Sequence, residues 1–114
     1  LTYPKRVSCN VKPLSLTDYG SLSFAKPDFD TFVCLKACIA AVKEGGLSPA
    51  AVNGANEQAV ALFLDRKISF LQIGELVSDV LGKFAGRNNF TVDDIINTDR
   101  EAREMVLNKA VQMA

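Results

Sequence analysis

The sequence contains no histidine, and its 114 residues include only three cysteines, Cys9, Cys34 and Cys38. Histidine is the commonest general base and the commonest metal ligand, so either kind of site would have to be built from other residues. An odd number of cysteines without regular spacing does not indicate a secreted, disulfide-stapled domain. Cys34 and Cys38 lie four residues apart on a predicted helix. Two small buried thiols are a better interpretation than a zinc site, because there is no histidine and no second cysteine pair.

Charge of one sign and long apolar segments are equally scarce. The 13 basic and 13 acidic residues cancel, whereas proteins dedicated to nucleic acids or membrane surfaces carry a basic excess. No stretch approaches the roughly 18 consecutive apolar residues that a transmembrane helix needs. No basic segment followed by an apolar one indicates a signal peptide. We therefore expect one domain with neither a nucleic-acid partner nor a membrane partner.

The motifs of common active sites are missing as well. The adjacent glycines in the middle of the chain lack the surrounding residues of a phosphate-binding loop, and without histidine no catalytic triad can form. Acidic residues gather at Asp28 with Asp30 and at Asp93 with Asp94. Both groups lie at the starts of predicted helices, so helix caps are a better interpretation than a metal site or a two-carboxylate hydrolase site. The sequence predicts no catalytic, cofactor-binding or metal-binding residue.

Residues 1–30 are expected to form an extended arm. Three of the four prolines lie there, and no helical period is present. The segment YGSLSF, residues 19–24, alternates Leu22 and Phe24 with serines, which predicts one short β-strand. Because a lone strand is unstable, the arm either packs on the following helices or, as we prefer, pairs with another domain or chain. Three basic residues on the arm are interpreted as solvated rather than as a phosphate site: Lys5, Arg6 and Lys12.

Residues 31–114 show helical periodicity and predict a small bundle of about four helices with short connections. Start and stop signals separate these helices: Gly45-Gly46, Ser48-Pro49, Ser69 with Gln72, Thr91, and Thr98 with Glu101. Thr91 is expected to open a short helix, and Thr98 a separate final one. The predicted fold is therefore mainly α, a helical bundle preceded by an arm that contains one short strand.

The segment NGANE, residues 53–57, places polar side chains inside an alanine-rich predicted helix. At about 100° per residue, Asn53, Asn56 and Glu57 share one strip that borders the core. A buried polar group without a partner costs about 1–3 kcal/mol, and an irregular segment has free backbone groups to offer. We predict that these three side chains clamp the backbone of the arm, or of the loop before the first helix. The alternatives to this clamp are a solvated face between helices and a catalytic or ligand-binding role.

The opposite side of the same helix is expected to face solvent, and it consists of Gly54, Gln58, Ala61 and Asp65. Gly54 costs roughly 0.8–1 kcal/mol relative to alanine inside a helix. Close approach of another segment would account for a glycine at this position.

Several motifs follow one another in an order that resembles a known family: YPKRV, VKPLSL, GSLSFAKPDFDTFVCLKAC, NGANEQAVALFLDRKISFLQI, and TVDDII followed by AREMV. Together they resemble the C-terminal part of the 1-deoxy-D-xylulose 5-phosphate reductoisomerase family, over essentially the whole chain. The stretch from PDFD to ISFLQI is the most specific. Two positions differ from the family pattern: Val33, where proline is common, and Gly54, where alanine is usual.

The resemblance implies a C-terminal fragment, the linker plus the helical domain, of an NADPH-dependent oxidoreductase. The whole enzyme would convert 1-deoxy-D-xylulose 5-phosphate into 2-C-methyl-D-erythritol 4-phosphate in non-mevalonate isoprenoid biosynthesis, using Mg²⁺ or Mn²⁺. A homodimer with a cytoplasmic (bacterial) or plastid location is also implied. The family's residues for NADPH, metal and substrate lie upstream of this sequence. We therefore expect the chain alone to be inactive and to bind no cofactor or metal.

The resemblance further implies that the arm lies against the catalytic domain of the same enzyme, which the bundle supports. Without that domain, we expect copies of the chain to associate as a homo-oligomer through the arm. The alternative to this family is an unrelated helical protein-interaction module whose arm pairs with a partner strand. A small hydrolase that uses paired acidic residues is a third and less favoured alternative.

Overall fold

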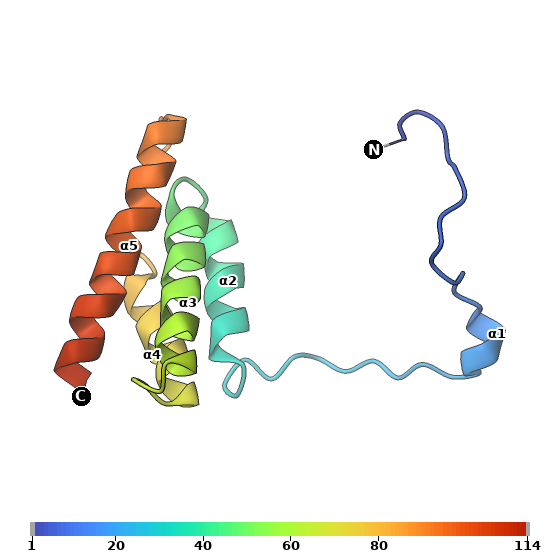
Figure 1. Cartoon of the computed structure of the whole chain (residues 1–114), viewed down its shortest axis with the longest axis horizontal. Helices are drawn as coiled ribbons and strands as arrows, with labels where there is room; N and C mark the ends of the chain where they lie inside the picture. Colours follow the sequence, from blue (N-terminus) through green and yellow to red (C-terminus); the bar gives the residue numbers. More distant parts are fainter. Residues whose placement is uncertain (1, 114) are drawn as a thin grey trace.

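The computed structural model describes residues 2–113, which form five α-helices and no β-strand (Figure 1). The helices are α1 (Leu16–Tyr19), α2 (Val33–Glu44), α3 (Ser48–Leu64), α4 (Phe70–Val80) and α5 (Val92–Met113). The prediction of a mainly α fold is confirmed. Residues 1 and 114, which begin and end the predicted units 1–30 and 31–114, lie outside the described residues.

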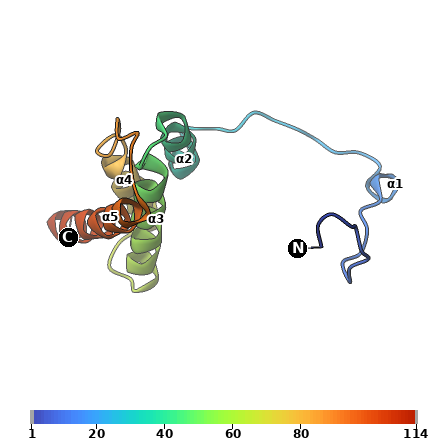
Figure 2. The same cartoon turned by 90° about the horizontal axis from the view of Figure 1, so that it is seen from above.

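The strand predicted near residues 19–24 is wrong for this structure. Tyr19 ends the single turn of α1, and residues 21–24 run extended without a ladder partner. The alternation of Leu22 and Phe24 with serines satisfies the side-chain pattern of a strand, but a strand also needs a neighbour to bond its backbone groups. Both views show no other described segment beside it (Figure 2).

Capping side chains fix the starts of α4 and α5, as the sequence predicts. The backbone N of Ser69 donates to Oε1 of Gln72 at 2.7 Å, and the N of Gln72 donates to Oγ of Ser69 at 3.4 Å. The backbone N of Thr91 donates to Oδ2 of Asp94 at 2.8 Å, and the N of Asp94 donates to Oγ1 of Thr91 at 3.3 Å. Each pair satisfies donors that the first helical turn leaves free.

The helix break predicted before Thr98 is wrong, because α5 is continuous from Val92 to Met113. Thr98 is only 2% exposed, and Ala102 and Val106 follow it at four-residue spacing on the same buried face. A capping side chain typically contributes about 1 kcal/mol of stability to the start of a helix. Burial of Thr98, Ala102 and Val106 against the bundle outweighs the preference of Thr98 for a helix start, so the helix continues through Thr98.

Helix α3 occupies the centre of the bundle and contacts α2, α4 and α5 (Figure 1). Its alanines Ala51, Ala55 and Ala59 are at most 1% exposed, and such small side chains let neighbouring helices approach closely. Larger buried side chains complete the core: Leu47, Ile73, Leu76, Val77, Val80, Phe84 and Val106. Burial of one such aliphatic side chain contributes about 1.5–3 kcal/mol, so apolar burial is what holds the bundle together.

Gly54 is buried, which corrects the expectation that it lies on a solvent face. A Cβ placed on Gly54 would lie 2.5 Å from Oδ1 and 3.0 Å from the backbone O of Asp99 in α5. The expected close approach of another segment is therefore confirmed, and that segment is α5. On the rest of the predicted solvent side, Ala61 and Asp65 are exposed and Gln58 is half-buried.

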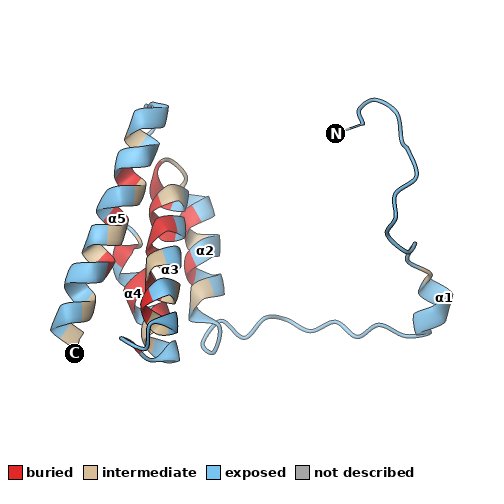
Figure 3. Ribbon diagram, viewed as in Figure 1, coloured by how far each residue is buried: buried red, intermediate tan, exposed pale blue. Residues whose placement is uncertain are grey.

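The arm leaves the bundle at the start of α2 and extends away from it (Figure 1). Asp28 shapes the turn before α2, because its carboxylate accepts hydrogen bonds from the backbone N of Asp30 and Thr31 and from Oγ1 of Thr31. The arm's large apolar side chains are exposed (Figure 3): Tyr3, Val7, Val11, Leu14, Leu16, Tyr19, Leu22 and Phe24. This bundle therefore does not bury the apolar surface of the arm.

Candidate functional site

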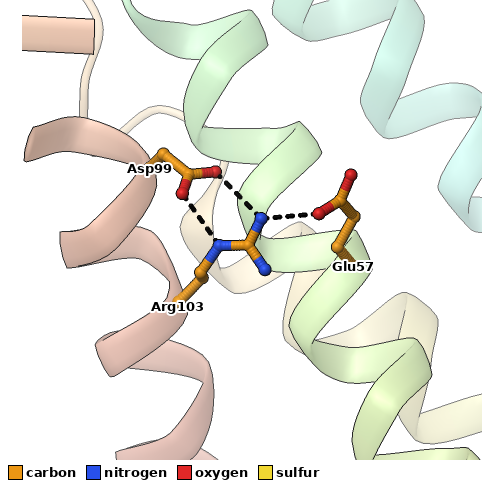
Figure 4. Close-up of polar contacts among 3 residues, drawn as sticks. All are labelled: Glu57, Asp99 and Arg103. Carbon is orange, nitrogen blue, oxygen red and sulfur yellow. Dashed lines mark hydrogen bonds and ion pairs between the residues drawn. The ribbon is translucent and has the colours of Figure 1, made fainter. Parts of the chain in front are cut away.

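Glu57 faces α5, where it pairs with Arg103 (Figure 4). Nη2 of Arg103 donates to Oε2 of Glu57 at 2.6 Å, and Nε donates to Oδ2 of Asp99 at 2.8 Å. The hydrogen bonds to Asp99 raise the pKa of Arg103 above its usual value, and the bond to Glu57 adds a smaller increase. Partly exposed ion pairs contribute only about 0.2–1 kcal/mol. The network therefore adds little stability, although its Glu57–Arg103 pair joins α3 to α5.

The two asparagines of the NGANE segment lie differently. Asn53 is exposed and Asn56 is half-buried, and neither amide bonds to the arm within the described residues. Glu57 finds its partner in Arg103, 46 residues away. The clamp predicted for Asn53, Asn56 and Glu57 stays a prediction. Arg103 was missed by the sequence reasoning, although its four-residue spacing from Asp99 is a visible helix-pair signal.

Asn56 opens onto an apolar groove of about 310 Å³ where the first turns of α2 and α4 meet the middle of α3. We call it the α2–α4 groove. Its lining consists of Thr31, Phe32, Val33, Cys34, Leu35, Asn56, Val60, Phe70, Leu71, Ile73 and Gly74. Gly74 lets α2 and α4 approach here, since a Cβ on it would lie 3.3 Å from Cβ of Val33. Sequence periodicity gave no sign of this groove, because it lies between three helices.

Among the described residues that line the α2–α4 groove, none is charged and Asn56 is the one with an amide side chain. Phe70 is held in place by an edge-to-face contact with Phe63, with ring centroids 5.8 Å apart. The groove suits an apolar segment that also offers a backbone group to Asn56.

The cysteines are less buried than expected. Cys34 is half-buried in the α2–α4 groove, and burial raises the pKa of its thiol, with a smaller effect from Cys38. Cys38 is exposed, because no described segment packs on that part of α2. Within residues 2–113, no three His, Cys, Asp or Glu side chains gather in a way that could hold a metal ion.

Of the paired acids, Asp94 caps the start of α5, as predicted. The predicted cap at Asp28 is wrong, because α2 starts without a side-chain cap and Asp28 bonds the turn before it. Hydrogen bonds from Thr31 and Asp30 lower the pKa of Asp28, and bonds from Thr91 lower the pKa of Asp94. Each carboxylate is thus committed to a local turn or helix start. Among the described helices, none has the length and apolar character needed to cross a membrane.

A second apolar groove, of about 360 Å³, lies between the end of α3 and the last turns of α5. We call it the α3–α5 groove. It is lined by Leu62, Lys67, Leu107, Asn108, Ala110 and Val111. The arm leaves the bundle on the other side (Figure 1), so the two grooves present separate surfaces.

The family model of the DXP reductoisomerase C-terminal domain matches residues 1–105 of this chain. The chain belongs to this family. The 1-deoxy-D-xylulose 5-phosphate reductoisomerase of Clostridium botulinum strain Hall is 46% identical over 104 residues, which cover 91% of this chain and 27% of that protein. The Acetivibrio thermocellus enzyme of the same name is 43% identical over 106 residues, which cover 93% and 28%. Family membership rules out the alternative of an unrelated helical module.

Solved reductoisomerase structures share the fold of this family member. The Zymomonas mobilis enzyme in complex with NADPH has a TM-score of 0.80 and 34% identity, covering 95% of this chain and 29% of that one. A DOX-P reductoisomerase in complex with magnesium has a TM-score of 0.81 and 32% identity, covering 97% and 30%. The chain thus spans less than a third of the relatives that it matches. The uncovered 5% is about six of 114 residues, so the matched segments include most of the arm.

Proposed function

We propose that this chain is the C-terminal structural module of an NADPH-dependent reductoisomerase. That enzyme converts 1-deoxy-D-xylulose 5-phosphate into 2-C-methyl-D-erythritol 4-phosphate in non-mevalonate isoprenoid biosynthesis, with Mg²⁺ or Mn²⁺. The observation that carries the proposal is the family match over residues 1–105, which includes the arm as well as the bundle. The chain contributes no catalytic, cofactor-binding or metal-binding residue and is inactive alone. Its place of action is the cytoplasm of a bacterium, or a plastid.

The two units of the chain have separate tasks in this proposal. Residues 1–30 are the linker, and residues 31–114 are the helical domain. The linker's exposed apolar side chains lie against the catalytic domain, because such a row of side chains is stable only when covered. The bundle supports that domain from outside the reaction centre.

A chimera tests this function directly. The matching C-terminal quarter of the Clostridium botulinum enzyme is replaced by this chain, and NADPH oxidation is measured with 1-deoxy-D-xylulose 5-phosphate. We expect activity from the chimera, and none from this chain alone or from the botulinum enzyme without its C-terminal quarter. An inactive, folded chimera beside an active parent enzyme would contradict the proposal.

The clamp formed by Asn53, Asn56 and Glu57 belongs to the same proposal. Asn56 is half-buried at the edge of a groove that reaches the end of the arm, where its amide can bond irregular backbone. In the chimera, Asn56→Ala should lower the free energy of unfolding by more than about 0.5 kcal/mol, the usual limit for surface substitutions. Asn108→Ala, in the exposed part of α5, is the matched control. Equal unfolding curves for the two variants would refute the clamp.

Copies of the isolated chain associate through the arm in this proposal, because no segment within residues 2–113 covers its apolar side chains. Gel filtration and crosslinking should show a species larger than the monomer. Removal of residues 1–28 should abolish it, since the core lies outside those residues. A purely monomeric full chain would show that the arm does not pair copies.

A further inference from the structure

The rim of the α2–α4 groove exposes large apolar side chains that no described segment covers. Phe32 is 59% exposed, Phe70 71% and Leu71 77%. Phe70 and Leu71 form the first turn of α4, and Phe32 immediately precedes α2, so the three converge on one end of the bundle. Apolar surface gathered around a hollow, rather than scattered singly, marks an interaction site.

The groove is continuous with the arm. Phe32 lines the groove and is also the residue at which the arm enters α2. The arm leaves the bundle at this end and runs outward with its own apolar side chains exposed (Figures 1 and 3). A domain large enough to cover the arm would therefore also contact the groove, at the point where the arm joins α2.

We infer that the α2–α4 groove is the docking site on the bundle for the catalytic domain of the reductoisomerase, through an uncharged apolar segment of that domain. This inference rests on the proposed function and adds the face through which it acts. The relatives are more than three times as long as this chain. The additional polypeptide of such an enzyme contains the segment that would occupy the groove. Most of the arm also takes part in the match to solved whole enzymes, so its extended course is one that such enzymes contain.

The chemistry of the groove selects the occupant. Its lining carries no charge, so an acidic or basic peptide would lose hydration there without gaining an ion pair. Asn56 can accept or donate one hydrogen bond to the backbone of a segment seated on Phe32 and Leu71. The α3–α5 groove offers Lys67 instead and lies away from the arm, so it provides the control surface.

The thiol of Cys34 reports on occupation of the groove. Its alkylation rate by iodoacetamide is measured in the isolated chain and in the chimera. Because a covered thiol reacts only when the interface opens, we expect Cys34 to react at least about tenfold more slowly in the chimera. A thiol introduced by Val111→Cys on the α3–α5 groove should react at similar rates in both.

A matched pair of substitutions then tests the apolar contact. Leu71 and Val111 are both 77% exposed, so replacing either by serine leaves the bundle folded, as circular dichroism verifies. In the chimera, Leu71→Ser should return Cys34 to within about threefold of its rate in the isolated chain, because one lost apolar anchor changes affinity about tenfold or more. Val111→Ser should leave Cys34 protected.

The outcomes separate this inference from the proposed function. An active chimera in which Cys34 stays as reactive as in the isolated chain overturns the docking face and leaves the function standing. An inactive chimera contradicts the function, and the inference with it. If the isolated chain forms a dimer that protects Cys34 and that Leu71→Ser dissociates, while the chimera leaves Cys34 reactive, the occupant is a second copy and the inference is wrong.

Discussion

Val106 and Val111 lie five residues apart on α5, and their environments are opposite: Val106 is 1% exposed and Val111 is 77% exposed. Replacing either by alanine removes two methyl groups. At Val106 this loses about 1.6 kcal/mol of burial, at about 0.8 kcal/mol per group, and about 1 kcal/mol more for the cavity left behind. Alanine returns up to about 0.6 kcal/mol in helix propensity at either position.

Val106→Ala should therefore lower the free energy of unfolding by about 2 kcal/mol, whereas Val111→Ala should leave it unchanged or raise it by about 0.5 kcal/mol. Urea unfolding followed by circular dichroism measures both. The shared propensity change cancels in the comparison, so the difference reports the lost burial and the cavity at Val106. Equal stabilities for the two variants would mean that α5 does not pack on the bundle through the stripe that contains Val106.

Three further variants probe particular contacts. Gly54→Val should lower the free energy of unfolding by about 2 kcal/mol or more in urea titrations, because a branched side chain would meet both the carboxylate and the backbone O of Asp99; an unchanged midpoint would show that α3 and α5 can separate freely. Ser69→Ala should cost about 1 kcal/mol through loss of the cap on α4, and a thermal melt identical to the parent's would count against that cap. Asp94→Asn should destabilise the chain near pH 6. The pKa of Asp94 is depressed below its ordinary value of 3.8 by bonds from Thr91, so its contribution is present above that value and is lost as the pH falls through the lower folded-state pKa. The gap between parent and variant should shrink below about pH 4, and a gap that grows on acidification would contradict the cap.

Sequence reasoning succeeded where the signal is local. The capping box of Ser69 and Gln72 acts over three residues, and the structure contains both of its hydrogen bonds. Asp94 was correctly interpreted as a cap for the same reason, whereas Asp28 bonds a turn and does not cap α2. Sequence reasoning failed where a local signal competes with distant packing: Thr98 carries a capping pattern, yet α5 buries it in mid-helix.

The candidate site could be anticipated only in part. Periodicity placed Asn56 beside the core, where the structure finds it half-buried. No periodicity argument could locate the α2–α4 groove, because its walls come from three helices whose relative positions depend on how α3 packs. The strand expected at residues 19–24 shows the same limit, since its side chains alternate correctly but its backbone has no ladder partner in the part of the chain that the structure describes.

The amino-acid sequence by itself determined the helical character of residues 31–113, the capped starts of α4 and α5, and the ordered motifs of the family, because these depend on interactions within a few residues. The tertiary structure alone decided that Gly54 faces Asp99, that Glu57 pairs with Arg103, and that Phe32, Phe70 and Leu71 surround one groove. These arrangements join residues far apart in the chain. They arise only when burial of the shared core fixes how the helices lie against one another.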